Sequence, residues 1–239
     1  MTASGRRARR LNLPERDALR DPLLSGLTVL LVALMFVVVP LHAAGAISDA
    51  GYGLAIILLL ASGILMQSTN WIVIFVLVVG VGLTVAAHAL RVASAQSDLD
   101  LYLDAFAWII IDVAMIAVIA GAVFAPGPIT LHRVNGAVLL YLTIGLTFVG
   151  FYTLVGLSAP HAFAGLSVSH DRGLASSAIY FSFVTLTSVG YGDIVPVHPV
   201  ARSLANLEGI IGQLFPATLL ARMVTLELED RRDRRKAKD

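Results

Sequence analysis

The sequence contains no cysteine, and charged residues occupy only 14% of its 239 positions. Without cysteine there is no disulfide framework, no thiolate nucleophile and no cysteine-ligated metal site. The scarcity of charge is matched by 57% hydrophobic residues and a mean hydropathy of +0.84, which lies outside the balance of soluble globular domains. The composition therefore predicts a protein embedded in a lipid membrane.

The basic residues gather near the two ends of the sequence, while the middle is almost neutral. The two clusters comprise Arg6, Arg7, Arg9 and Arg10, and Arg231, Arg232, Arg234, Arg235, Lys236 and Lys238. Cytoplasmic segments carry an excess of Lys and Arg, so we expect both termini in the cytoplasm and an even number of spans. The clusters either act only as topology determinants or also contact anionic lipid head groups. We expect a multi-pass protein of the plasma membrane.

Long apolar stretches recur along the chain, and a helix needs about 20 apolar residues to cross a bilayer. Six stretches qualify, the second being the shortest: 23–47, 51–67, 71–90, 102–124, 134–157 and 200–226. The sequence therefore predicts an all-α membrane protein with six transmembrane helices.

The segment between the last two stretches, 158–199, is too polar in its first half to span. Ser176 and Ser177 are predicted to cap a short helix that runs to Val184. Such a helix is too short to cross, and non-helical backbone within a bilayer is tolerated only where protein buries it or it lines a water-filled path. We therefore expect a re-entrant segment.

A distinctive run follows that half-helix: Thr-Leu-Thr-Ser-Val-Gly-Tyr-Gly-Asp, from Thr185 to Asp193. A selective cation pore needs oxygen cages that replace the ion's hydration shell, and backbone carbonyls can form them if they point at one axis. Such a backbone adopts φ/ψ regions that are unfavourable for residues with a side chain, which explains the presence of glycines at two positions, Gly190 and Gly192. The carboxyl end of the short helix before this run would place partial negative charge near the pore, where it favours a cation.

This run resembles the selectivity filter of the potassium-channel pore family, whose carbonyl rings hold the ion. The resemblance implies that potassium is bound at Ser188, Val189, Gly190 and Tyr191, and that no other cofactor is needed. It implies supporting roles for Thr185, Thr187, Gly192, Asp193 and Tyr180. One chain supplies one filter strand and the loop is not repeated, so a homotetramer with the pore on its four-fold axis is expected.

The resemblance divides the chain into five parts. They are a cytoplasmic tail (1–22), a four-helix membrane domain laid out like a voltage sensor (23–124), a cytoplasmic linker (125–133), a pore domain (134–226) and a basic cytoplasmic tail (227–239). The pore domain would comprise an outer helix, the re-entrant pore helix, the filter and an inner helix.

Two positions depart from the family pattern. Ser188 stands where many relatives have Thr, and the missing methyl leaves the side chain freer to rotate. Tyr180 and Phe181 stand where many relatives have two Trp. Tyr180 can still donate a hydrogen bond to Asp193, whereas Phe181 cannot donate one to Tyr191.

The last span contains residues that bear on gating. Gly212 matches the family's hinge position, Gly209 lies one turn earlier, and Pro216 removes a backbone hydrogen bond. Glycine is also common in membrane helices because it permits close packing. Both interpretations stay open at this stage.

Ionisable residues within or beside the spans need partners. For Glu208 we expect a buried contact with Ser182 or Thr185 of the pore helix. Asp112 is expected either to pair with His88 or to occupy a small aqueous pocket. His132, in the linker, is a candidate pH sensor or an ordinary linker residue.

The fourth apolar stretch, 102–124, has no Lys or Arg, so strong voltage gating is not expected. No enzymatic motif is indicated, because the glycine pair lacks the Lys-Ser/Thr of a phosphate loop. No nucleic-acid partner is expected. Three alternatives remain: a non-selective cation pore, a potassium transporter subunit, and a non-conducting modulatory subunit.

Overall fold

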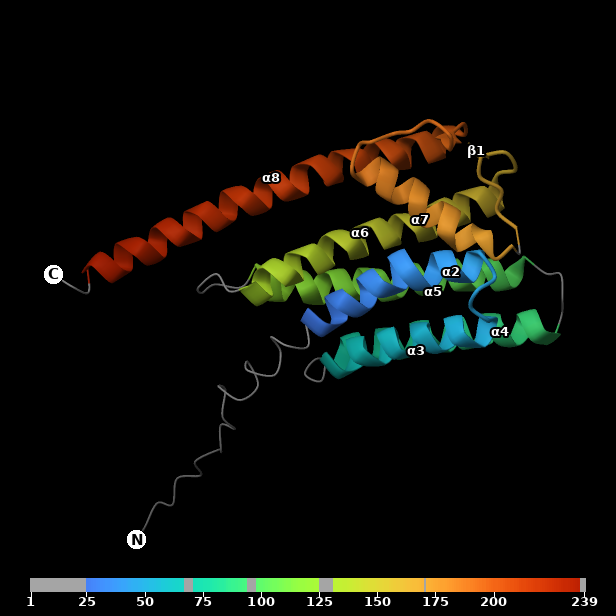
Figure 1. The fold of residues 1–239 in the computed structure, drawn as a ribbon, viewed down its shortest axis with the longest axis horizontal. Coiled ribbons are helices and arrows are strands. Elements are labelled where there is room, and N and C mark those ends of the chain that lie inside the picture. The colour runs from blue at the N-terminus through green and yellow to red at the C-terminus, as the bar shows by residue number, and fades with distance from the viewer. Residues whose placement is uncertain (1–24, 67–70, 94–97, 125–130, 170, 237–239) are drawn as a thin grey trace, which may run out of the picture.

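The computed structural model describes residues 25–66, 71–93, 98–124, 131–169 and 171–236. Within these ranges the chain is helical apart from two short strands and the turns and loops that connect the elements, and the long helices run side by side along the molecule (Figure 1). Five helices of the described residues are long and apolar enough to cross a membrane: Ser25–Ala43, Trp71–Leu90, Leu99–Val123, Arg133–Ser158 and Pro199–Arg222. A multi-pass membrane protein is thereby supported.

Four helical segments of the described residues lie within 23–124, the expected amino-terminal domain. The first, Ser25–Ala43, contains one π-helical stretch, η1 (Leu34–Val38), and then α2 (Val39–Ala43). Pro40 lies in the first turn of α2. In a regular helix its ring would crowd the carbonyl of Phe36, and the wider π turn accommodates it. The other members are α3 (Asp49–Met66), α4 (Trp71–Ala93) and α5 (Leu99–Val123).

Glycines set how closely these helices approach. A Cβ at Gly80 of α4 would lie within contact distance of the Ile111 side chain and 3.6 Å from the carbonyl oxygen of Ala107, both on α5. This is the small-residue packing typical of membrane helices.

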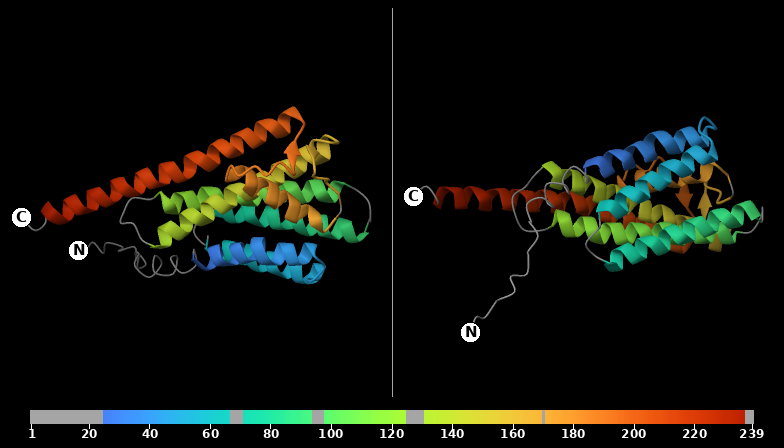
Figure 2. Two further views of the ribbon diagram at one scale, coloured as in Figure 1. Left: turned by 45° about the horizontal axis from the view of Figure 1, so that its top comes forward. Right: turned by 90° about the horizontal axis from the view of Figure 1, so that it is seen from below.

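The carboxyl-terminal half contains α6 (Leu131–Ser158), β1 (Phe163–Ala164), α7 (Gly173–Leu186), β2 (Val195–Pro196) and α8 (Pro199–Lys236). The short α7 lies between α6 and α8, and α2 packs beside it. Figure 2 shows α8 continuing well past the other helices toward the carboxyl terminus. The last two spanning helices therefore flank a helix of only 14 residues.

Several expected boundaries are wrong. Helix α7 begins at Gly173, so Ser176 and Ser177 lie inside its second turn, and its N-cap residue Arg172 makes no side-chain capping bond. Residues 131–133 belong to α6 rather than to the linker, and α8 continues through most of the expected tail 227–239. The apolar pattern sets where a helix can cross a bilayer and does not set where the helix ends.

The six-span count stays a prediction. A continuous helix, α3, occupies the expected second stretch with 18 residues, about 27 Å at 1.5 Å per residue, close to the thickness of a bilayer core. The expected tail 1–22 and most of the linker, 125–130, lie outside the described residues.

Candidate functional site

The backbone after α7 alternates between left-handed and ordinary conformations. Ser188, Gly190 and Gly192 have φ values of 58°, 56° and 82°, whereas the intervening Val189 and Tyr191 have negative φ. Positive φ is readily adopted by glycine but costs energy at a serine. The sequence accounts for the two glycines; the conformation of Ser188 was not expected.

The start of the loop is held by the end of α7. The amides of Ser188 and Val189 donate to the carbonyls of Thr185 and Val184, both at 2.9 Å. Thr187, the C-cap, donates from its hydroxyl to the carbonyl of Phe183 at 2.6 Å. The loop therefore leaves the helix at a fixed angle, with the carboxyl end of α7 beside it.

One side of this loop faces a hollow of about 810 Å³ between α7 and α8. The hollow is lined by Val184, Thr185, Ser188, Gly190, Ala205, Asn206, Gly209, Ile210, Gln213 and Leu214. Gln213 of α8 donates its amide to the Ser188 hydroxyl at 2.9 Å. This contact, missed at the level of sequence, fixes a side chain that was expected to rotate freely.

The apolar side chains of the loop are exposed in the single chain. Val189 is 54% exposed and Tyr191 is 71% exposed. The Tyr191 ring lies parallel to that of Tyr180 with centroids 6.2 Å apart. Only this one face of Tyr191 is covered, so the rest of the side chain is open to a neighbouring molecule.

The far end of the loop is held by Tyr180 and Asp193. As expected, the Tyr180 hydroxyl donates to Oδ2 of Asp193, at 2.7 Å, and the Ile194 amide donates to Oδ1 at 3.0 Å. The hydrogen bond from Tyr180 lowers the pKa of Asp193 below its usual value of 3.8. The carboxylate therefore stays charged at neutral pH.

A two-stranded brace, absent from the sequence prediction, lies just beyond Asp193. Strands β1 and β2 pair antiparallel, with Phe163 opposite Pro196 and Ala164 opposite Val195. Gly165 follows β1 with φ of 82°, and a Cβ there would collide with the carbonyl oxygen of Asp193. A glycine is thus required where the loop before α7 meets the loop after it.

A buried hydrogen-bond cluster joins the three helices of this half. Glu208 of α8, which has no exposed surface, accepts a short bond from the Tyr152 hydroxyl of α6 and lies 2.5 Å from the Ser182 hydroxyl of α7. The Ser182 hydroxyl also lies 2.8 Å from the carbonyl oxygen of Gly145. The expected Ser182 partner is confirmed, whereas Tyr152 gave no signal in the sequence.

Gly212 of α8 lies against the end of α7. A Cβ at this position would collide with the carbonyl oxygen of Leu186, whereas one at Gly209 would come no closer than 3.9 Å to Thr185. Helix α8 is continuous through Pro216. Close packing therefore accounts for Gly212, and hinge motion at Gly212, Gly209 or Pro216 stays a prediction.

The predicted pairing of Asp112 with His88 is wrong. His88 is exposed on α4, whereas Asp112 is buried and its Oδ2 has no hydrogen-bond partner. Asp112 instead borders a small apolar cavity of about 40 Å³, together with Thr143 of α6. The cavity is large enough for one water, but the alternative of a small aqueous pocket stays a prediction.

Two contacts that sequence reasoning missed join the amino-terminal domain to the other helices. Arg222 of α8 donates to the carbonyl of Phe124 at 2.7 Å and lies 5.3 Å from the centre of its ring. At the opposite end, Arg172 bonds to Asp49 at 3.1 Å. His132 lies in the first turn of α6, and its side chain is outside the described residues.

Comparison with known proteins identifies a family model that covers α7, the loop after it and most of α8. Residues 162–228 match a family model described as an ion channel. The chain is 37% identical over 87 residues to Protein LctB of Bacillus caldotenax, a match covering 35% of this chain and 64% of that protein. It is 36% identical over 92 residues to Two-pore potassium channel 1 of Arabidopsis thaliana, covering 38% of this chain and 22% of that protein.

A third relative is the inward rectifier potassium channel Kirbac3.1 of Paramagnetospirillum magnetotacticum, 38% identical over 42 residues, which is 18% of this chain and 14% of that protein. The resemblance to pore-loop potassium channels is confirmed. The chain spans less than two thirds of the length of these relatives. No solved structure matches the chain.

Proposed function

We propose that this chain is one subunit of a potassium channel that conducts potassium passively, with Ser188, Val189, Gly190 and Tyr191 as the ion-binding residues. The observation that carries the proposal is the alternation of φ from Ser188 to Gly192, directly after the carboxyl end of α7. Alternating backbone handedness turns successive carbonyls to one side, which suits a dehydrated cation. Thr185, Thr187, Gly192, Asp193 and Tyr180 hold this loop in place.

The functional unit is a homotetramer. A single loop offers carbonyls from one side only, and its large side chains and the neighbouring face of α8 are exposed, including Val189, Tyr191, Ile210 and Leu214. Three further copies around a four-fold axis would cover these surfaces and complete the oxygen cages. The hollow lined by α7 and α8 would become one wall of a central cavity.

The chain spans the plasma membrane with both basic ends in the cytoplasm, where they meet anionic lipids. Helix α5 (Leu99–Val123) contains no Lys or Arg, so its movement would carry no positive gating charge. The amino-terminal domain therefore does not act as a strong voltage sensor. Gating is expected to involve α8, where Gly212, Gly209 and Pro216 are the hinge candidates.

Ion flux into liposomes tests the proposal. Purified protein is reconstituted into vesicles, and tracer uptake is measured down a potassium or a sodium gradient. We expect uptake with potassium, little with sodium, and loss of uptake in Gly190→Ala, because φ of 56° resists a side chain. The control is Gly82→Ala, where an added Cβ meets nothing within 4 Å.

Other outcomes identify the alternatives. Equal uptake of sodium and potassium would indicate a non-selective pore. Uptake that saturates and depends on a second ion would indicate a transporter subunit. No uptake from a correctly assembled tetramer would contradict conduction by this chain alone and favour a modulatory subunit.

A further inference from the structure

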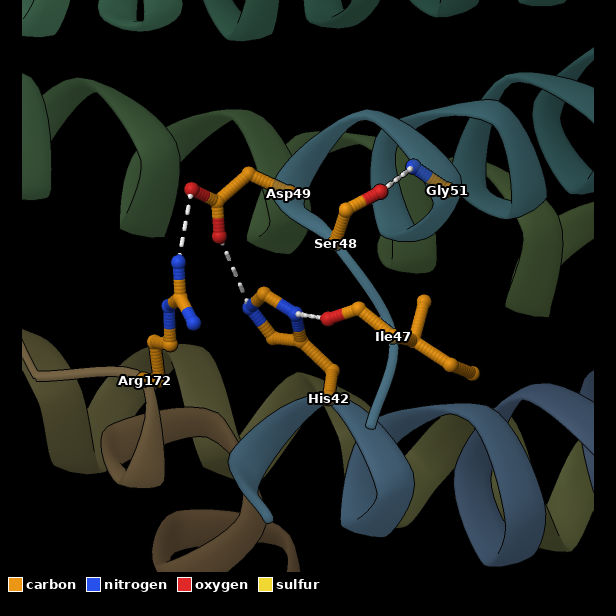
Figure 3. Close-up of polar contacts among 6 residues, drawn as sticks. All are labelled: His42, Ile47, Ser48, Asp49, Gly51 and Arg172. Carbon is orange, nitrogen blue, oxygen red and sulfur yellow. Dashed lines mark hydrogen bonds and ion pairs between the residues drawn. The ribbon is translucent and has the colours of Figure 1, made fainter. Parts of the chain in front are cut away.

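His42, at the end of α2, lies between two oxygen acceptors (Figure 3). Its Nδ1 is 3.2 Å from the carbonyl oxygen of Ile47, and its Nε2 is 3.7 Å from Oδ1 of Asp49. A neutral imidazole has one N–H, so it can present a hydrogen to only one of these oxygens. The doubly protonated ring presents a hydrogen to both.

Two further groups surround the imidazole ring of His42. His42 is only 7% exposed, and its ring stacks on that of Tyr52 with centroids 4.4 Å apart and planes 5° apart. Burial opposes a charge, but the face of an aromatic ring and a carboxylate each attract a cation. The pocket therefore contains the two groups that a protonated imidazole needs.

Asp49 connects His42 to the start of the pore helix α7. Its Oδ2 accepts a hydrogen bond from Nη2 of Arg172 at 3.1 Å, while Oδ1 faces His42 (Figure 3). Because the two contacts use different oxygens, a proton on His42 adds a link without displacing Arg172. Both partners of the Arg172–Asp49 pair are more than half exposed, and such a pair alone contributes little.

We propose that His42 is a proton sensor on the side of the membrane where the filter loop ends at Asp193, the filter-mouth side. Histidine is the side-chain type whose charge ordinarily changes between about pH 5 and 8. Protonation completes a chain from His42 through Asp49 to Arg172 and fixes the first turn of α7 to the amino-terminal domain. A steadier pore helix holds the filter in its conducting form, so acid on this side raises the current.

The charged and titratable groups around the ring are few in the described residues. Asp49 and Tyr52 face it from α3, Arg172 approaches from the start of α7, and Asp171 lies exposed beside Arg172. The side of the membrane and the effect on current rest on the proposed channel function, whereas the proton-dependent link itself does not.

The link is tested first without any measurement of conduction. Melting temperatures of the reconstituted protein are compared for wild type, His42→Gln, Asp49→Asn and the double variant, at pH 5.5 and pH 8. We expect the two substitutions to be non-additive at pH 5.5, equivalent to a factor of about 1.5 to 5 in the unfolding equilibrium, and additive at pH 8. Additivity at both values, or equal coupling at both, would overturn the proton link.

The effect on the pore is tested by single-channel recording with the pH changed on each side in turn. We expect the open probability to rise by a factor of about 1.5 to 5 from pH 8 to pH 5.5 on the filter-mouth side, and this response to vanish in His42→Gln. Arg172→Gln, an exposed change, should also remove it. His161→Asn, an exposed position with φ of 62°, is the control.

A current with the same pH response in His42→Gln as in wild type would overturn the sensor. Absence of any current would contradict the proposed channel function instead, and the melting experiment would still decide whether the link exists.

Discussion

At the scale of single residues, the contact between Tyr180 and Asp193 shows how the mouth of the filter loop is held. Both residues are accessible to water, yet each has a defined partner at 2.7 Å. The hydrogen bond shows that the Tyr180 hydroxyl can act as the donor to Asp193 at this position. Phe181 lies buried against Tyr152 and Phe163 instead, so it has no donor role.

Tyr180→Phe should keep the fold and make the end of the filter loop at Asp193 less rigid. The ring stays, but Asp193 loses its donor, so we expect potassium currents that decline faster under sustained opening. The check is the time course of macroscopic current in wild type and variant. Ser167→Ala, a change in the loop before α7, is the control, and an unchanged time course in Tyr180→Phe would contradict the role of this bond.

The same bond predicts a pH window. Because the folded-state pKa of Asp193 is lowered, its stabilising contribution is complete above its usual pKa of about 4 and is lost only as the pH falls further. Acid between pH 8 and 5 should therefore leave this bond intact. A response to pH in that range that disappears in Asp193→Asn, and not in His42→Gln, would contradict this account.

Glu208 is a second residue whose neighbours decide its role. Glu208→Gln should assemble, because an amide can accept from Tyr152 and donate to the Ser182 oxygen while Ser182 donates to Gly145. Glu208→Leu leaves the buried Tyr152 hydroxyl without its acceptor, at about 1 to 3 kcal/mol, whereas Ser182 can still donate to Gly145. The melting temperature of the tetramer checks this, and equal losses for both variants would contradict it.

At the scale of elements, α7 and α8 meet at a point where only glycine fits. Gly212→Ala forces a methyl group against the backbone of Leu186, and overpacking of this kind costs about 1 to 3 kcal/mol. Gly209→Ala is the matched control on the same helix. We expect a lower melting temperature for Gly212→Ala only; a stable Gly212→Ala tetramer with a low open probability would instead support the hinge.

The strands β1 and β2 act as a brace, and Gly165 is the position that tests it. Gly165→Ala combines a positive φ with a collision at the carbonyl of Asp193. We expect the loop to shift and the ratio of potassium to sodium permeability to fall, measured from reversal potentials. Gly53→Ala, with open space around it, is the control, and unchanged selectivity in Gly165→Ala would contradict the brace.

The elements also show where sequence reasoning succeeds. The long helices could be found from the sequence because bilayer thickness sets the length of the apolar stretch that each spanning helix needs. The run from Thr185 to Asp193 was informative because few backbones need that alternation of glycine. Tyr152, Gly165 and Gln213 could not be found, because each acts through a contact with a segment distant in the chain. Ser176 and Ser177 misled because a capping residue type inside an apolar helix looks the same as one at its start.

At the scale of the whole molecule, the isolated chain is incomplete on the side of the filter loop. Apolar side chains on α7, α8 and the loop itself face outward, while Glu208, Tyr152 and Ser182 are fully covered within the chain. The contacts among α6, α7 and α8 are therefore complete within the chain, whereas its side at the loop after α7 is open. We expect symmetric assembly to cover this side.

The amino-terminal domain touches the pore helices at both ends, through Asp49 with Arg172 and through Phe124 with Arg222. It carries no row of basic residues on α5, so the membrane potential, at about 2.3 kcal/mol per charge per 100 mV, has little to act on there. We expect open probability to change little with voltage in symmetric solutions. A steep voltage dependence without blocking ions would contradict this.

The central claim, a potassium-selective pore at Ser188–Tyr191, is tested most directly by the reversal potential of the purified protein in a lipid bilayer, with potassium on one side and sodium on the other. The account predicts a reversal potential near the potassium equilibrium value. Open channels with a reversal potential near zero would contradict it.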